Sequence, residues 1–281
     1  MVRLLNGVSE RENLCIGSCI LPAIVFIILF TTRSALDVSE ITNMQRLFYR
    51  VACSKTRIPG FDPDLSEWKV ERVTTMSEMF RSTAFDNESL EDWNVENVVN
   101  MNGMVKETDF NNDSLKNWKV DKVVNMNGVF EDSSFNGDLS NWDTSTVEDM
   151  TSMFDTATFN NDSIKKWSVE NVISFENMFG SNEAFNQDLS KWKVSSAEVF
   201  AEMFAGASAF NQQLCWDVSS ATDTYEMFRD SPGGLLECCS AYNPIDSGNY
   251  KVEELNLIDG ECPTKAPSKK SKKNGKRDFM I

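Results

Sequence analysis

The sequence lacks histidine altogether, and long hydrophobic runs are scarce. Without histidine there is no Ser-His or Cys-His nucleophile pair, and the commonest general base and metal ligand are missing. The C-x-x-C spacing that zinc sites favour is also absent. The one prominent apolar run, residues 20–30, is shorter than the roughly 20 residues that a membrane-spanning helix needs. These absences argue against histidine-dependent hydrolases and C-x-x-C zinc sites, and the short apolar run suits a signal peptide better than a membrane span.

Positive charge is also lacking over most of the chain. Residues 1–264 carry 20 basic and 42 acidic residues, whereas the last 17 residues carry seven Lys/Arg and one acid. An acidic body repels phosphates, so nucleic-acid binding is not expected. The basic stretch TKAPSKKSKKNGKR has no apolar residues to bury, and we expect residues 265–281 to be a disordered tail.

The N-terminus has the pattern of a targeting segment. Arg3 and Arg11 precede the apolar run ILPAIVFIILF, which is followed by TTRSA. We interpret residues 1–35 as a signal peptide or, alternatively, a retained N-terminal membrane anchor. Both interpretations place the body of the chain at the cell surface or outside the cell.

All seven tryptophans lie on one lattice. They recur at intervals of 24 or 25 residues, and a phenylalanine series keeps the same step; the tryptophans are Trp68, Trp93, Trp118, Trp142, Trp167, Trp192 and Trp216. Self-similarity at a fixed period of 20–50 residues indicates a solenoid, in which each unit buries its apolar side against its neighbours. We therefore expect about 7–8 stacked coils.

The pattern inside one unit predicts its local structure. In FDPDLSEWKVERVTTMSEMF, residues 61–80, Trp68 and Val70 alternate around Lys69, as in a short strand. The apolar spacing of three and four from Val73 to Phe80 predicts a short helix. Ser145 and Glu148 in a later copy match a capping box. Each coil is thus predicted as a short strand plus a short helix, an α/β unit.

These patterns divide the chain into five parts. They are the targeting segment 1–35, a degenerate first repeat with an insertion at 36–60, the regular repeats at 61–230, a cysteine-containing C-terminal cap at 231–264 and the basic tail at 265–281. Terminal repeats are commonly atypical because one of their faces lacks a neighbour.

The repeated phrase resembles a known family. FNQDLSKWKVSSAEVFAEMF (185–204) and residues 135–154 are similar to the BspA-like leucine-rich-repeat surface proteins, also described as the mycoplasma lipoprotein-associated repeat. The resemblance covers about 36–230. It implies a right-handed leucine-rich-repeat-like solenoid on a surface or secreted protein, with a role in adhesion and protein binding and no catalysis.

Residues that flank the tryptophans are predicted to point away from the core. Seven coils would align them into a polar ribbon about 30 Å long, suited to a protein or glycan ligand, although a merely solvated face is the alternative. The position after each tryptophan supplies the candidate binding residues Lys69, Asn94, Lys119, Asp143, Ser168, Lys193 and Asp217.

Asn and Asp residues recur after each phenylalanine and again two positions later. We expect their side chains to hold the turns through backbone hydrogen bonds. Stacked carboxylates that bind calcium are the alternative, but no known calcium loop appears, so no metal or other cofactor is predicted. Three such loops contain Asn-x-Ser, and these candidate N-glycosylation sites, or chance matches, are Asn87, Asn112 and Asn161.

Four cysteines cluster toward the C-terminal end, as suits an exported protein. Two disulfides could staple the last coil and cap, with three possible connectivities, among Cys215, Cys238, Cys239 and Cys262.

These predictions favour a non-catalytic recognition or adhesion protein that binds protein or glycan partners, rather than an enzyme. Acidic residues recur with the repeat instead of standing out as a single pair, as a hydrolase would require. The alternative is a membrane-anchored intracellular scaffold or regulatory interaction module.

Overall fold

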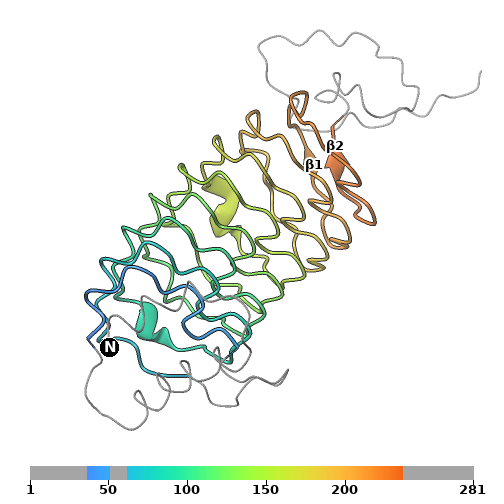
Figure 1. Cartoon of the computed structure of the whole chain (residues 1–281). Coiled ribbons are helices and arrows are strands. Elements are labelled where there is room, and N and C mark those ends of the chain that lie inside the picture. Colours follow the sequence, from blue (N-terminus) through green and yellow to red (C-terminus); the bar gives the residue numbers. More distant parts are fainter. Residues whose placement is uncertain (1–36, 51–61, 237–281) are drawn as a thin grey trace, which may run out of the picture.

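The computed structural model describes residues 37–50 and 62–236. In these residues the chain winds into coils that stack along one axis (Figure 1). Parallel bridges join each coil to the next, and they form one chain of partners: Asn43, Thr75, Asn100, Asn125, Asp149, Ser174, Val199 and Asp223. The seven bridges therefore connect eight coils, and from Thr75 onward the bridged residues are 24 or 25 apart, as in the sequence repeat. The first of these coils is residues 37–50.

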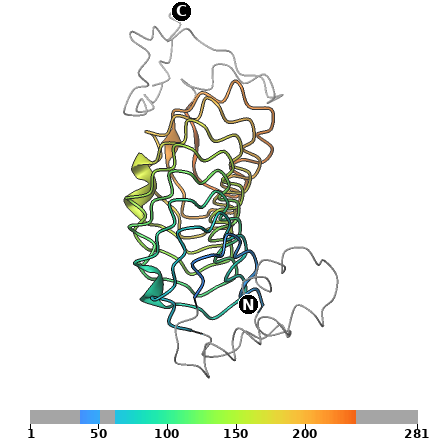
Figure 2. The same cartoon turned by 60° about the vertical axis from the view of Figure 1, so that its left-hand side comes forward.

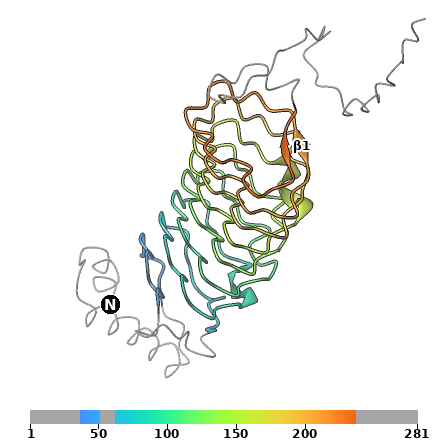
Figure 3. The ribbon, with the colours of Figure 1, turned by 90° about the vertical axis from the view of Figure 1, so that its right-hand side faces the viewer.

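Regular secondary structure is sparse in the described residues. Two short 3-10 helices, η2 (Glu88–Leu90) and η3 (Asp162–Lys166), occupy equivalent loops and lie on the same side of the stack (Figure 2). Two parallel strands, β1 (Gln213–Leu214) and β2 (Gly234–Leu235), pair at the C-terminal end (Figure 3). No helix in the described residues is long and apolar enough to cross a membrane, and the apolar run 20–30 lies outside them.

The core is a set of stacked side chains that runs through the described coils, from Val38 to Met227. Every tryptophan is buried, as are the repeated valines, methionines and phenylalanines. Four pairs of neighbouring indoles stack almost parallel with ring centroids 6.3 Å apart, for example Trp68 on Trp93 and Trp142 on Trp167. The prediction that the tryptophans belong to the core is confirmed. Burying aromatic rings of this size stabilises the stack through both their area and their contacts.

The segment predicted as a helix has a different backbone. Residues 74–82 and their equivalents, which we call the turn ribbon, form successive tight turns in which Met79 N–H donates to the Met76 carbonyl at 3.1 Å. Glu78 and Ser82 have positive φ, which an α-helix does not permit. The helix prediction is therefore wrong here, because i,i+3 turns place apolar residues at the same spacing as a helix.

Alternate N–H groups of the turn ribbon point along the stack. Met76, Glu78, Phe80 and Ser82 donate to the carbonyls of Asn100, Asn102, Met104 and Lys106, at 2.7–2.9 Å. The same four-bond register recurs between successive coils. The turn ribbon thus satisfies its backbone partly within each coil and partly by pairing with the next.

The predicted strand at Trp-x-Val forms no backbone ladder with the neighbouring coils in the described residues. Trp93 N–H instead donates back to the Leu90 carbonyl at 3.1 Å, and the parallel bridges lie farther along the coil, at Thr75 and its equivalents. Ser145 also starts no helix, because its N–H donates to Asp143 Oδ1 at 3.0 Å, and Glu148 N–H donates to the preceding coil's Val124 carbonyl. The backbone hydrogen bonds between coils therefore lie in the turn ribbon and not beside the tryptophan, where the strand was predicted.

Candidate functional site

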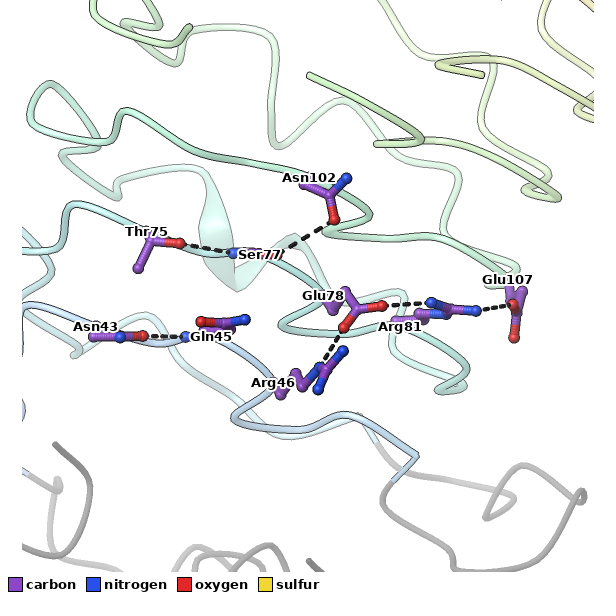
Figure 4. Close-up of polar contacts among 9 residues, drawn as sticks. All are labelled: Asn43, Gln45, Arg46, Thr75, Ser77, Glu78, Arg81, Asn102 and Glu107. Carbon is purple, nitrogen blue, oxygen red and sulfur yellow. Dashed lines mark hydrogen bonds and ion pairs between the residues drawn. The ribbon is translucent and has the colours of Figure 1, made fainter. Parts of the chain in front are cut away.

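The turn ribbon carries a partly buried charge network across its first three coils, centred on the buried Glu78. Glu78 accepts hydrogen bonds from Arg46 of the preceding coil and from Arg81 of its own coil (Figure 4). Arg81 also donates to Glu107 of the next coil at 2.8 Å. The guanidinium groups of Arg46 and Arg81 both lie over the Tyr49 ring, 5.4 and 5.7 Å from its centroid. The network therefore ties three coils together through alternating charges.

The charges of this network compensate each other. Burial alone would raise the pKa of Glu78, but hydrogen bonds from Arg46 and Arg81 outweigh it and hold the pKa below its usual value. Burial opposes the shift at Glu107 as well, where Ser82 and Arg81 lower the pKa. Both carboxylates are consequently ionised at neutral pH and matched by cations.

Two coils farther along the turn ribbon, at Asp155, the carboxylate charge is no longer matched by cations in this way. Lys106 pairs with Glu131, but the equivalent position in the next coil is Asp155 and in the one after it is Gly180. Burial and the charge of Glu131 raise the pKa of Asp155 to about 6. A Cβ added to Gly180 would lie 2.8 Å from an Asp155 carboxylate oxygen, so the glycine provides the space that this side chain occupies.

All seven side chains of the predicted binding column are exposed. Local hydrogen bonds fix several of them: Asn94, Asp143 and Asp217 each accept from the N–H two residues later, at 3.0–3.1 Å. Lys193 pairs with Glu170 of the preceding coil at 2.7 Å. Exposed members Lys69, Lys119 and Ser168 complete the column, whose residues recur once per coil beside the buried tryptophans.

A second exposed column, at the start of each turn ribbon, escaped the sequence analysis. It contains the exposed aliphatic side chains Val99 and Ile173, which are 42% and 44% accessible. The other exposed members are Thr42, Thr74, Glu148, Glu198 and Thr222, and Val124 at the same position is half-buried. Val99 and Ile173 follow the buried valines Val98 and Val172 directly, so the hydropathy pattern alone assigns both residues of each pair to the core. Only the turn geometry shows that the second residue points outward.

The recurring Asx residues bond to the backbone, as predicted, and in two ways. The first set links coils: Asn136 N–H donates to Asn111 Oδ1 at 2.8 Å, and the same bond recurs along the column. The second set closes turns within a coil, as where Ser140 N–H donates to Asp138 Oδ1 at 2.8 Å. In the described ranges no group of three or more acidic or cysteine side chains is arranged to hold a metal ion.

The three candidate glycosylation asparagines are half-buried and already bonded. Each accepts the N–H of the serine two residues later through Oδ1, as at Asn87, whose bond to Ser89 N–H is 2.8 Å. In Asn112 the Nδ2 also donates to Asp86, and in Asn161 it donates to the Asn136 carbonyl. Attaching a sugar to either of these two nitrogens in the folded chain would replace a contact between coils.

Cys215 is disulfide-bonded. It stands directly before Trp216 in the last coil. The other three candidate cysteines, Cys238, Cys239 and Cys262, lie outside the described residues.

Comparison with known proteins identifies a family by its repeats. Residues 29–139 and 130–233 match the family described as "Mycoplasma protein of unknown function, DUF285". No curated protein and no protein of solved structure matches the chain. The two matched segments together span nearly all of the described coils.

Proposed function

This chain belongs to the family described as "Mycoplasma protein of unknown function, DUF285", and on that premise we propose that it is a non-catalytic recognition or adhesion protein. It acts at the cell surface or after secretion, and it binds a protein or glycan partner. Within the family's mycoplasma repeat proteins, we place it with the BspA-like leucine-rich-repeat surface proteins, as a right-handed leucine-rich-repeat-like solenoid.

One observation carries the proposal. Stacking in register aligns equivalent positions into columns, and the buried columns are nearly constant while the exposed ones vary in charge and size. The column after the tryptophans contains basic, acidic and neutral side chains, and the column at the start of the turn ribbon contains the exposed Val99 and Ile173. Such a mixture of apolar and charged groups on a rigid surface suits macromolecular recognition.

The disulfide of Cys215 supports export. Disulfides persist in oxidising compartments and are rare in the cytosol. The apolar segment at 20–30, preceded by arginines, supports the same route through a signal peptide or an N-terminal anchor. An intracellular, membrane-anchored scaffold would instead keep Cys215 reduced.

Labelling of intact cells with a membrane-impermeant reagent separates these two locations. An exported chain is labelled, and its mass shifts on reduction and reveals any loss of residues 1–35. Lack of labelling in intact cells, together with reduced Cys215, would favour the intracellular scaffold.

The binding role is tested with the full chain against an array of extracellular proteins and glycans. We expect saturable binding that Asp143→Lys weakens at least about tenfold, since one charge contact is commonly worth about 1–2 kcal/mol in a complex. Asp132→Lys makes the same charge change on the turn ribbon, where Asp132 is also exposed, and should bind like the unaltered chain. Equal binding by both variants would show that the exposed column of residues after the tryptophans is not part of the binding surface.

A further inference from the structure

We propose that the two ends of the stack are complementary, and that copies of this chain associate head to tail through their first and last turn ribbons. The partner is a second copy of the same chain. This contact would repeat between molecules the pairing that already joins each coil to the next.

The last turn ribbon has a row of N–H donors that find no acceptor among the described residues. Inside the stack, the N–H groups equivalent to Met76, Glu78, Phe80 and Ser82 donate to the following coil. In the last coil these positions are Thr224, Glu226, Phe228 and Asp230, and their N–H groups form no hydrogen bond with any residue of 37–50 or 62–236. All four positions are exposed or half-buried.

The first turn ribbon has the matching row of acceptors. The first coil donates to four carbonyls of the second coil, those of Thr75, Ser77, Met79 and Arg81, which therefore point back toward the first coil. The equivalent carbonyls of the first coil point in the same direction along the stack, away from the second coil. Those carbonyls belong to Asn43, Gln45, Leu47 and Tyr49, and within the described ranges they accept no hydrogen bond. An edge of unpaired backbone groups is a template for pairing with another chain.

Applying the internal register to two copies gives a definite alignment. Thr224 of one copy faces Asn43 of the next, and Asp230 faces Tyr49, with four N–H donors opposite four carbonyls. At β1 the last coil is already paired with β2, so the proposed contact is limited to the turn ribbons.

Side-chain charges favour the same alignment. Inside the stack Arg46 pairs with Glu78, its equivalent in the next coil. The equivalent of both in the last coil is Glu226, which would therefore lie beside Arg46 of the following copy. Asp230 would likewise lie beside Arg50, and both of these side chains are exposed. Opposite charges at the two ends steer association and select the parallel register.

The interface joins two different surfaces, so it leaves one of each open at the ends of every assembly. Such head-to-tail contacts build open chains of copies instead of closed dimers. The expected product is a row of molecules that continues the stack of coils.

A charge swap tests the contact in the full chain. The measurement is molar mass against concentration by sedimentation, with a monomer of 31.8 kDa. In self-association, Asp230→Lys sets a lysine against Arg50 of the next copy, and Arg50→Asp sets an aspartate against Asp230. Each variant alone should associate at least about tenfold more weakly than the unaltered chain. An equimolar mixture should recover association, because contacts between the two variants again pair opposite charges.

Asp132→Lys is the matched control, since Asp132 occupies the same position in an inner coil, is exposed and has positive φ like Asp230. It should associate like the unaltered chain. A monomeric unaltered chain, a mass that stops at the dimer, or a mixture that fails to recover association would each overturn the proposal. Far-ultraviolet circular dichroism of each variant establishes that its fold is retained.

Discussion

The two sides of each coil are held to their neighbours by different chemistry. On the turn ribbon the backbone makes the contacts, as where Glu78 N–H donates to the Asn102 carbonyl at 2.7 Å. On the tryptophan side the side chains make them: Trp93 Nε1 donates to the preceding coil's Leu65 carbonyl at 3.0 Å, and this bond recurs at every later tryptophan, Trp118, Trp142, Trp167, Trp192 and Trp216.

This difference decides which positions can vary. A backbone bond forms whatever the side chain is, so the outward positions of the turn ribbon carry Glu, Gly, Ser or Asn at equivalent places. A side-chain bond requires its own residue, and the tryptophan and Asx columns are accordingly almost constant. The tryptophan side should be the more sensitive to substitution and the turn ribbon the more tolerant.

The largest effect is expected on the tryptophan side. Trp142→Ala removes a buried ring and its hydrogen bond to the Leu115 carbonyl, and it should lower the free energy of unfolding by about 3–5 kcal/mol. Trp142→Phe keeps most of the ring and should cost less. Urea unfolding followed by circular dichroism measures both. A Trp142→Ala variant as stable as the unaltered chain would contradict the assignment of stability to this column.

The turn ribbon has one exception to its tolerance, the buried carboxylate of Glu78. Glu78→Ala removes the partner shared by Arg46 and Arg81 and should cost about 2 kcal/mol, because it leaves Arg81 partly buried with fewer acceptors. Glu40→Ala breaks an ion pair with Arg72 in which both side chains are exposed, and should change stability by less than about 0.5 kcal/mol. Equal losses in the two variants, measured by urea unfolding, would show that burial does not distinguish these pairs.

The pH dependence of stability tests Asp155, the turn-ribbon carboxylate whose pKa is raised. Its pKa of about 6 is raised above that of an unfolded aspartate, so the folded chain keeps the proton to higher pH. Stability should therefore fall as pH rises from about 4 to about 6, and the penalty should be complete above that range. Glu78 has the opposite sign, since its lowered pKa stabilises the fold above the usual carboxyl pKa and the benefit is lost as pH falls.

Asp155→Asn removes the ionisation penalty. We expect it to stabilise the chain by about 1–2 kcal/mol at pH 8 and by almost nothing near pH 4, as measured by urea unfolding at both values. The exposed Asp132→Asn is the control and should give no such pH-dependent difference. A gain from Asp155→Asn that is the same at both pH values would point to packing instead of ionisation.

The same division explains what the sequence could reveal. Side-chain contacts between coils require the same kind of residue in every coil. The tryptophan series that includes Trp142 and the Asx column that includes Asn136 could therefore be found from sequence alone. The turn ribbon leaves little record, because its pairing is made by the backbone and its apolar spacing matches a helix. Its positive-φ positions are occupied by glycine at Gly103, Gly128 and Gly206 but by other residues elsewhere, which hides the signal. The charge network at Glu78 depends on these turns and could not be predicted without them.

Those positive-φ positions provide the finest test of the comparison. Ser152 has φ of 53°, a conformation that costs a residue with a Cβ roughly 1 kcal/mol, and glycine occupies the equivalent positions 103 and 128. Ser152→Gly relieves this cost but adds freedom to the unfolded chain, so we expect a net gain of about 0.5 kcal/mol. Ser140→Gly, on the tryptophan side, is the control: Ser140 is not among the positive-φ residues, so glycine should destabilise the chain by about 0.5–1 kcal/mol. Thermal unfolding of both variants measures the difference in sign. If both variants are less stable than the unaltered chain, then the positive φ of Ser152 has no conformational cost, and the turn ribbon accepts varied residues at such positions without strain.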